Sequence, residues 1–238
     1  MKRFFNPATI TIMILLVMSS VMSGRFSDPM AWFMDKLLIL PGIILGLSIH
    51  EFGHAITAYK LGDNTPYNQG RVTMSPGAHI DPVGFVSLLF IGFGWGVPVQ
   101  INPRSFKNPR RDELIVSFAG VVMNLITAII FAIIVKVIYM AAPEFLFLNE
   151  MGDIVLTVLL YVIQINIILM VFNLLPIPPL DGFNIVTELF KLRRFDWWYR
   201  IYNNGFFILL LFILFDVTDM ILSPAVYGIY STIINIIF

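Results

Sequence analysis

The amino-acid sequence predicts an all-α polytopic membrane protein. Hydrophobic residues make up 58% of the 238 positions and charged residues only 13%, whereas soluble domains carry about 25% charged residues. The mean hydropathy of the chain is +0.85. Several apolar stretches approach or exceed the length of about 20 residues that a helix needs to cross a bilayer. We expect five or six transmembrane helices, together with a re-entrant hairpin and a short β-hairpin.

The overall composition excludes several kinds of site. The formal net charge is zero, so the charge balance gives no indication of a nucleic-acid partner. The chain contains no cysteine, which excludes disulfides, thiolate metal ligands and a cysteine nucleophile. Any metal site must therefore use histidine and carboxylate ligands. Neither an internal repeat nor a long polar stretch is visible, and we expect a single membrane domain.

The N-terminal segment has the features of a signal peptide or an uncleaved signal anchor, and we favour the anchor. Lys2 and Arg3 precede an apolar stretch from Ile10 to Met22. Because positively charged residues stay on the cytoplasmic side of a membrane, the N-terminus is predicted to lie inside. The second helix, from about Leu37 to Lys60, then runs inward and ends at the cytoplasmic side.

This second helix carries the motif H-E-x-x-H near its predicted cytoplasmic end. Residues four apart share a face of an α-helix, so His50 and His54 can present their imidazole nitrogens to one metal ion. Glu51 then lies beside the ion, in the arrangement of the zinc hydrolases. The alternative is a pair of helix-face histidines satisfied by their neighbours. Ionisable residues inside apolar helices are costly and usually functional, which favours the metal site.

Residues 62–82 are rich in turn formers and predict a short β-hairpin near this site. An alternating run from Arg71 to Met74 lies between glycine and proline residues. An exposed strand edge can pair with an extended substrate through main-chain hydrogen bonds. An ordinary surface hairpin explains the same pattern, and both interpretations stay open.

The stretch from Val83 to Val99 predicts a re-entrant hairpin. It is apolar, contains glycines at positions 84, 92, 94 and 96, and is short for a full span. A basic cluster from Arg104 to Arg111 follows it, and the segment before it is also predicted to lie inside. Both ends therefore lie on one side, with irregular backbone that is tolerated where it is buried in protein or lines a cavity.

The remaining apolar stretches predict further spanning helices. Leu114 to Met140 is long enough to cross a bilayer, and Ile154 to Leu175 returns. The loop between them carries acidic residues and no basic residue, as expected of an outer loop. Gly205 to Phe215 begins an outward helix, and Ala225 to Phe238 forms a short last helix.

Asp181 is the best candidate for a third metal ligand. Three prolines within residues 176–179 cannot continue a helix, so the chain must unwind before Asp181. A catalytic zinc site uses three protein ligands and keeps one open position. The predicted topology brings Asp181 to the same membrane side as His50 and His54. The alternative is that Asp181 caps a helix over residues 183–192.

Two other polar residues receive structural interpretations. His79 lies among turn residues, and we favour a structural hydrogen bond over a role in steering the substrate carbonyl. Asn124 lies inside an apolar helix, where an interhelical hydrogen bond is the simplest explanation.

Taken together, these motifs resemble the site-2 proteases, which are intramembrane zinc metallopeptidases, and in particular their minimal bacterial branch without a PDZ or CBS domain. The resemblance covers roughly residues 37–191. It rests on His50 to His54, Gly62-Asp63 with Thr65-Pro66, Gly70-Arg71, His79-Ile80-Asp81-Pro82, Gly94-Trp95, Pro109-Arg110-Arg111, and Asn173 to Gly182 as N-L-L-P-I-P-P-L-D-G.

The resemblance implies a role for each candidate residue. His50, His54 and Asp181 resemble the ligands of one zinc ion, and Glu51 resembles the catalytic base. Asn173 resembles a residue that orients substrate or stabilises the oxyanion. The family commonly has Ala-Gly-Pro where this chain has Val121 after Ala-Gly, and Asn where this chain has Ser before Pro76. Neither departure removes a ligand.

The resulting expectation is a zinc-dependent intramembrane endopeptidase of the cell membrane. It would cleave transmembrane substrate proteins near the cytoplasmic leaflet, with the bilayer as its other partner and no nucleic acid. Residues 1–36 would form the anchor and outer loop, residues 37–191 the catalytic core, and residues 192–238 the C-terminal helices. Two rivals remain, an inactive family member that acts as a membrane-protein scaffold and a membrane transporter. The oligomeric state is not indicated.

Overall fold

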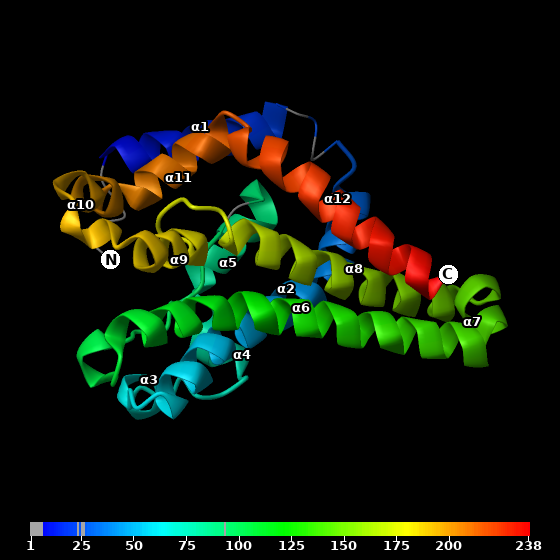
Figure 1. The fold of residues 1–238 in the computed structure, drawn as a ribbon. Coiled ribbons are helices and arrows are strands. Elements are labelled where there is room, and N and C mark those ends of the chain that lie inside the picture. The colour runs from blue at the N-terminus through cyan, green and yellow to red at the C-terminus, as the bar shows by residue number, and fades with distance from the viewer. Residues whose placement is uncertain (1–6, 23, 25–26, 93) are drawn as a thin grey trace.

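The computed structural model describes residues 7–22, 24, 27–92 and 94–238, and these residues are mostly helical (Figure 1). The longer helices are α1 (Pro7–Met22), α2 (Pro29–Lys60), α5 (Pro82–Ile91), α6 (Pro109–Ala141), α8 (Glu150–Asn173), α9 (Asp181–Phe190), α10 (Asp196–Asn203), α11 (Gly205–Leu214) and α12 (Val217–Ile237). Shorter pieces are α3 (Thr65–Asn68), α4 (Pro76–His79), η1 (Pro103–Ser105), α7 (Pro143–Leu148) and η2 (Leu192–Arg194).

Three long helices form the centre of the molecule. α2 packs against both α6 and α8, and α6 packs along α8 (Figure 1). Glycines permit this close approach, because a Cβ at Gly42 would lie 3.0 Å from the carbonyl oxygen of Tyr161 on α8. A Cβ at Gly53 would lie 2.9 Å from the carbonyl oxygen of Ala119 on α6. The motif-bearing helix is thus held tightly between its two neighbours.

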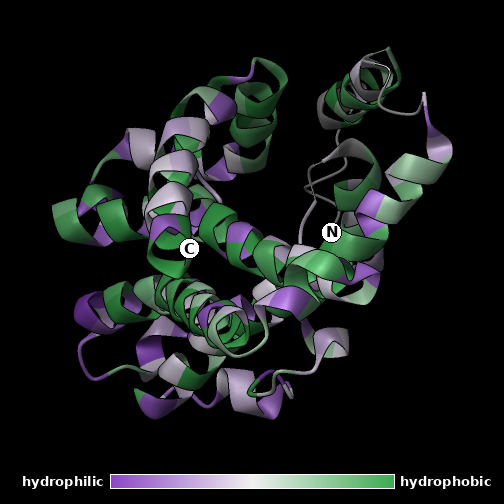
Figure 2. Cartoon of the chain, turned by 90° about the vertical axis from the view of Figure 1, so that its right-hand side faces the viewer, coloured by the Kyte–Doolittle hydropathy of each residue, from purple (hydrophilic) through white to green (hydrophobic). Residues whose placement is uncertain are grey.

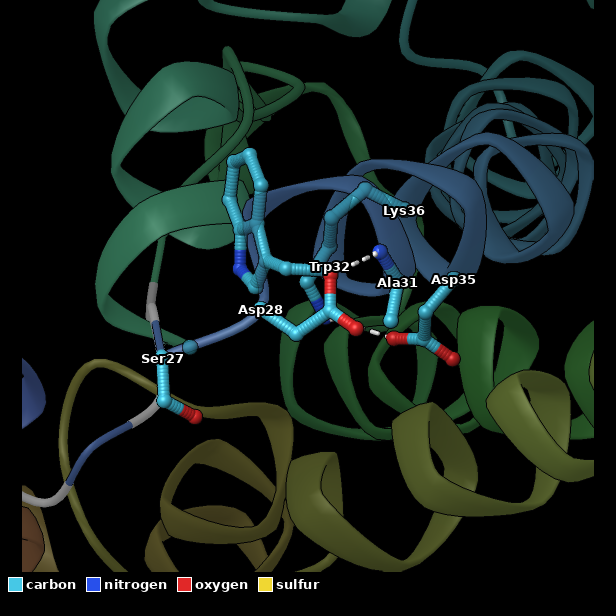
Figure 3. Close-up of a pocket in the computed structure, with 7 residues that line it drawn as sticks. Ser27, Asp28, Ala31, Trp32, Asp35 and Lys36 are labelled. Atoms are coloured by element: carbon cyan, nitrogen blue, oxygen red, sulfur yellow. Dashed lines mark hydrogen bonds and ion pairs between the residues drawn. The ribbon is translucent and has the colours of Figure 1, made fainter.

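Local sequence explains where these helices begin. α2 starts at Pro29, and the Asp28 carboxylate accepts hydrogen bonds of 3.1 and 3.0 Å from the amides of Met30 and Ala31 in the first turn. Figure 3 shows the bond from Ala31. The Asn149 side chain caps α8 in the same way. Both are favoured N-cap residues, and proline is favoured in the first turn. In the second turn of α2, the Asp35 carboxylate accepts a 2.7 Å hydrogen bond from the Tyr161 hydroxyl, which ties α2 to α8.

The prolines after α8 end the helix as predicted. α8 stops at Asn173, the chain turns through residues 174–180, and α9 begins at Asp181. The N-cap position of α9 is Leu180, and no side chain caps this helix. The Asp181 side chain is therefore not used as the helix cap that the sequence allowed. It is free to point away from α9.

Four helices among the described residues are long and apolar enough to cross a membrane, fewer than the predicted five or six. They are α2, α6, α8 and α12. The stretches Ile10–Ser19 and Gly205–Leu214 are apolar but shorter. Figure 2 shows hydrophobic residues along most of the helices. The predicted last helix over residues 225–238 is wrong at its start, because α12 begins at Val217 and continues through Pro224. The basic residues of the predicted anchor lie outside the described residues.

The predicted β-hairpin is not confirmed. Residues 72 and 73 form a bend, and residues 71, 74 and 75 have no regular secondary structure. The described residues contain one isolated β-bridge, between Ile80 and Gly96, and no strand. Local hydrogen bonds replace cross-strand pairing here. The Arg71 amide donates to the Pro66 carbonyl over 2.8 Å, and the Thr73 amide donates to the Arg71 carbonyl over 2.9 Å. The turn-forming residues therefore determined the conformation here, and the short alternating pattern did not produce a strand.

The stretch after this turn folds back on itself, as the re-entrant hairpin predicted. α5 is followed by Gly92, which caps the helix with a φ of 86°, and the chain then returns in an extended conformation. The Val97 amide donates to the His79 carbonyl over 2.7 Å, so the two ends lie side by side. A Cβ at Gly84 would lie 2.1 Å from the Trp95 carbonyl oxygen, so only glycine allows this contact. The depth of this segment in a membrane stays a prediction.

Candidate metal centre

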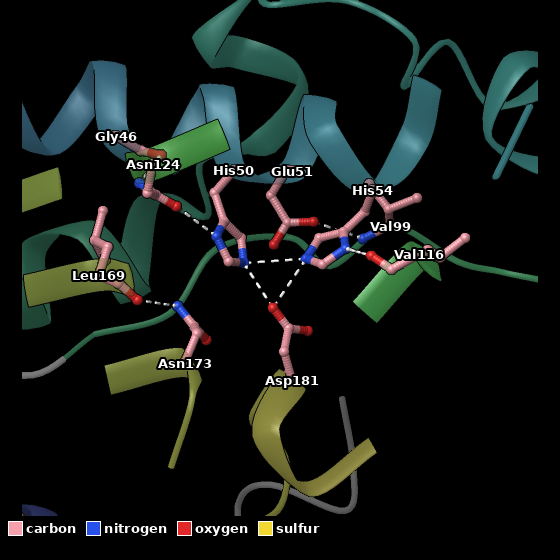
Figure 4. A network of polar contacts seen from close by, with 10 residues as sticks. All are labelled: Gly46, His50, Glu51, His54, Val99, Val116, Asn124, Leu169, Asn173 and Asp181. Atoms are coloured by element: carbon pink, nitrogen blue, oxygen red, sulfur yellow. Dashed lines mark hydrogen bonds and ion pairs between the residues drawn. The ribbon is translucent and has the colours of Figure 1, made fainter. Parts of the chain in front are cut away.

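Two histidines of α2 form the first part of the site. His50 and His54 lie one turn apart, and both are buried with 6% of their surface exposed. Their Nε2 atoms lie 3.0 Å apart, and the rings meet edge to face (Figure 4). The H-E-x-x-H spacing therefore brings the two imidazoles together on the buried face of the helix, as predicted.

Asp181 completes the group from the other side. Its Oδ2 atom lies 3.2 Å from His50 Nε2 and 3.1 Å from His54 Nε2 (Figure 4). Because the prolines stop α8 early, α9 can start with its first side chain directed at α2. Among the described residues, these three form the group of histidines and carboxylates that could hold a metal ion.

The hydrogen-bond partner of Nδ1 in each imidazole determines which ring nitrogen carries the proton. His54 Nδ1 lies 2.8 Å from the Val116 carbonyl oxygen, which can only accept. His50 Nδ1 lies 2.7 Å from Asn124 Oδ1. Asn124 is oriented by its Nδ2, which donates to the Gly46 carbonyl and to Asn166 Oδ1. Both Nδ1 atoms therefore donate, and in the neutral rings both Nε2 atoms carry lone pairs.

This tautomer leaves three electron-rich atoms facing one another. The two Nε2 lone pairs and the Asp181 carboxylate oxygen are separated by 3.0 to 3.2 Å. Oδ2 of Asp181 is buried and has no hydrogen-bond donor among the described residues. Tetrahedral ligands at about 2.0–2.1 Å from zinc are about 3.3–3.4 Å apart. The separations of the three atoms are therefore close to those expected of three side chains that would hold one zinc ion.

Gly120 on α6 keeps the space beside the imidazoles open. A Cβ at this position would lie 2.5 Å from His54 Nε2 and 2.6 Å from His50 Cε1. No side chain larger than hydrogen fits beside the metal-facing nitrogens. The chain therefore needs glycine here because of the two imidazoles, although glycine has a low helix propensity.

Glu51 lies next to this group and is held by the returning limb of the hairpin. Its Oε2 accepts a 2.9 Å hydrogen bond from the Val99 amide (Figure 4). The same limb is fixed further along, where the Asn102 amide donates to the buried Asp63 carboxylate over 2.6 Å. The extended segment that passes Glu51 is thus anchored on both sides of it.

Two other predicted residues lie differently. Asn173 is the last residue of α8, and its Nδ2 donates to the Leu169 carbonyl of its own helix over 2.9 Å (Figure 4). Within the part of the chain that the structure describes, its side chain forms no hydrogen bond with the three candidate ligands. His79 is fully buried, and its Nε2 lies 2.7 Å from the Thr73 carbonyl oxygen. This contact agrees with the structural interpretation of His79.

Several contributors to the site were not identified from the sequence. Asn124 makes the expected interhelical hydrogen bonds, but its contact with His50 was missed. The signal was available, because Asn124 and Asn166 are polar residues within apolar spans. The Val116 carbonyl and the Val99 amide are backbone groups, so the residue type at these positions does not indicate their role. Gly120 was noted only as part of a family motif.

Comparison with known proteins identifies the group to which this architecture belongs. The family model described as "Peptidase family M50" matches residues 137–215, which include Asp181. "Putative zinc metalloprotease YwhC" of Bacillus subtilis is 40% identical over 166 residues, covering 66% of this chain and 74% of the relative. The chain belongs to peptidase family M50.

Other M50 relatives are more distant. Relatives from two organisms carry the name "Putative zinc metalloprotease Rip2". The protein from Mycobacterium tuberculosis is 29% identical over 168 residues, which are 68% of this chain and 61% of the relative. The protein from Mycolicibacterium smegmatis is 27% identical over 196 residues, which are 77% of this chain and 71% of the relative. No solved structure was found to match the chain.

Membership of family M50 establishes the class of enzyme and its metal. M50 is the site-2 protease family, so the resemblance seen in the sequence is confirmed. The protein is a membrane zinc metalloprotease, and the group of His50, His54 and Asp181 could bind its one metal ion.

Proposed function

We propose that the protein is an intramembrane endopeptidase that cleaves transmembrane substrates near the cytoplasmic leaflet. One observation carries this proposal. Three atoms suited to zinc converge within 3.2 Å of one another, with Glu51 beside them, inside a group of helices long enough to span a bilayer. A hydrolytic site at this depth would meet peptide bonds that are themselves within the membrane. Regulated intramembrane proteolysis is the corresponding process.

In this proposal His50, His54 and Asp181 hold the zinc ion, and Glu51 is the catalytic base. When bound, zinc supplies a Lewis acid that polarises the scissile carbonyl and increases the acidity of water. Glu51 takes the proton of the attacking water and transfers it to the leaving amine. The Val99 amide occupies one carboxylate oxygen of Glu51, while the other oxygen lies between the two histidines (Figure 4).

Asn173 would act on the substrate. Its amide nitrogen has two hydrogens, and one is used by the Leu169 carbonyl. The second hydrogen can donate to a substrate carbonyl or to the developing oxyanion. The position of Asn173 beside the unwound segment 174–180 supports this role, because that segment also carries Asp181.

A helical substrate must unwind before cleavage, since its peptide bonds are hidden in its own hydrogen bonds. The sequence leaves open whether the turn around Arg71 receives the unwound chain as a strand partner. The extended limb from Trp95 to Asn102 is better situated, because it passes Glu51 directly. We propose that the substrate lies between this limb and residues 173–182.

The orientation follows from the distribution of charge. The basic residues Lys60, Arg104 and Arg110 lie at or after the end of α2 and at the start of α6. The opposite connection between α6 and α8 carries Glu144 and Glu150 and no basic residue. The positive-inside rule therefore supports a multi-pass protein with its N-terminus and active-site opening toward the cytoplasm. We treat residues 1–238 as one membrane domain with residues 37–191 as the catalytic core.

The two rival functions have less support. A scaffold would not need two imidazoles in the metal-binding tautomer with a base beside them. A transporter is expected to contain an inverted repeat, and the sequence shows no internal repeat.

Cleavage of a purified transmembrane substrate in proteoliposomes tests the proposal. The enzyme should cut the substrate within its membrane segment, on the cytoplasmic half, and mass spectrometry of the products locates the cut. Asp181→Ala should lose both zinc and cleavage. Products cut only in the aqueous portion of the substrate, or a fully active Asp181→Ala variant, would refute it.

A further inference from the structure

The segment that follows α9 carries exposed aromatic and basic side chains that the metal centre does not use. We call this set the aromatic–basic surface. It consists of Lys191, Arg194, Phe195, Trp197, Tyr199 and Arg200, all of which are exposed. α10 lies at the end of the molecule opposite α7 (Figure 1).

α10 is fixed to the protein by one buried side chain. Trp198 is 6% exposed, its Nε1 donates to Thr187 Oγ1 over 2.8 Å, and its ring stacks on Phe183 of α9. Side chains of a helix advance by about 100° per residue. Trp197 and Tyr199 therefore flank the buried face of α10, and Arg200 points away from it.

The neighbouring aromatic side chains stay largely uncovered. Trp197 is 45% exposed and Tyr199 is 52% exposed, and Phe195 stacks on Trp197 with ring centroids 5.8 Å apart. Amphipathic rings of tryptophan and tyrosine gather at the headgroup level of membranes, where one side is apolar and the other wet. An interfacial location explains why these rings face outward.

The basic residues of the surface are available to an anion. Among the described residues, Lys191, Arg194 and Arg200 form no ion pair, whereas Arg193 pairs with Glu113 and with Glu188. The Arg194 guanidinium lies 4.7 Å from the centre of the Phe195 ring, so it projects beside the aromatic group. Asp196 is the acidic residue on α10, in its first turn. The surface therefore keeps a net positive charge.

We propose that the aromatic–basic surface binds the headgroups of anionic phospholipids. The aromatic rings lie at the headgroup level, and the three unpaired cations meet the lipid phosphates. The combination points to a lipid, because cations alone could bind any anion and exposed rings alone could contact any apolar partner. The surface is joined through Trp198 to α9, so this contact would hold at the membrane boundary the helix that begins with Asp181. The lipid contact itself does not depend on proteolysis.

The absence of cysteine from the chain makes a site-specific test possible. Asn203 is exposed on α10 and lies on the side away from Trp198. An Asn203→Cys variant labelled with a fluorophore is reconstituted in phosphatidylcholine vesicles. Brominated phosphatidylglycerol or brominated phosphatidylcholine is then added at the same mole fraction as a quencher. The proposal predicts quenching by the anionic lipid about twofold or more above that by the neutral lipid.

The charge dependence is tested with two double variants in the labelled background. Arg194→Gln with Arg200→Gln should bring the quenching ratio close to one. Lys60→Gln with Arg104→Gln removes the same charge from exposed positions elsewhere and should leave the ratio unchanged. Far-UV circular dichroism verifies that both variants are folded.

Three results would overturn the proposal. One is equal quenching by the two lipids in the parent. Another is an equal fall of the ratio in both double variants, which would show a general charge effect. The third is strong quenching by aqueous iodide with none by either lipid, which would place the surface in water or against a soluble partner.

Discussion

At the scale of single residues, the site is built from atoms whose proton positions are determined by their neighbours. The Val116 carbonyl and Asn124 Oδ1 each accept from an Nδ1, so both Nε2 atoms are directed at Asp181 as lone-pair donors. Such outer partners typically contribute 10–100-fold to metal affinity. The site therefore depends on α6 as much as on the helix that carries the motif.

Gly120→Ala should abolish zinc binding. The added methyl group would lie 2.5 Å from His54 Nε2, a distance at which one of the two must move. Zinc content of the purified variant, measured by atomic absorption, should fall well below one per chain. Gly228→Ala is the matched control, because a Cβ at Gly228 meets nothing within 4 Å. Full zinc content in Gly120→Ala would show that the space beside the imidazoles is not required.

At the scale of helices, the position of Asp181 depends on how both ends of α9 are held. At its start, the prolines after α8 force a turn. At its end, Arg110 of α6 donates through Nε to the Glu188 carbonyl over 2.6 Å and through Nη2 to the Leu189 carbonyl over 2.8 Å. A cation that donates to the last carbonyls of a helix stabilises that end. α6 thus holds α9 as well as the histidines.

Arg110→Gln should weaken zinc binding without touching a ligand. Removing the bonds at the end of α9 costs about 1–2 kcal/mol, which in a chain of this size lowers Tm by about 2–8 °C. Zinc affinity, measured by competition with a chromogenic chelator, should fall because Asp181 is less well placed. Arg111→Gln is the control, since Arg111 is exposed and its one ion pair with a described residue is to neighbouring Asp112. Equal losses of zinc affinity in the two variants would argue against a role of the Arg110 hydrogen bonds in placing Asp181.

The sequence predicted the helices that local patterns specify. It did not predict features that depend on contacts between residues far apart in the chain. The H-E-x-x-H period and the prolines before Asp181 are local signals, so a helix around the motif and the break after α8 were predicted correctly, although α2 begins at Pro29 and not near Leu37. The run at Arg71 to Met74 alternates over too few residues to specify a strand, and turn hydrogen bonds prevailed. The last helix was predicted to begin at Ala225, yet α12 begins at Val217 and continues through Pro224. The hydrogen bond from Val99 to Glu51 joins backbone to side chain over 48 positions, and no local pattern encodes it.

At the scale of the whole molecule, the metal centre joins three parts of the chain. α2 supplies the histidines, α9 supplies Asp181, and α6 supports both. A bound ion would stabilise the folded state, because the unfolded chain lacks a preformed site. Metal content and global stability should therefore be coupled.

Removal of zinc by a chelator should lower the thermal stability of the whole protein. Saturation at 100 times Kd stabilises by about 2.7 kcal/mol, which corresponds to a Tm shift of about 5–11 °C for a chain of this length. Thermal unfolding in detergent with and without chelator measures the shift, and added zinc should reverse it. The double variant His50→Ala with His54→Ala should show no response. A chelator response of the same size in that variant would mean that the stabilising ion binds elsewhere.

The central claim is that Glu51 performs proton transfer at a zinc ion held by His50, His54 and Asp181. The most direct test is the cleavage rate of a reconstituted transmembrane substrate by the parent and by Glu51→Gln, with zinc measured in the same samples. Both proteins should contain about one zinc per chain, and the variant should lose at least about 10²-fold in rate. A zinc-loaded Glu51→Gln variant that cleaves at the parental rate would contradict the account.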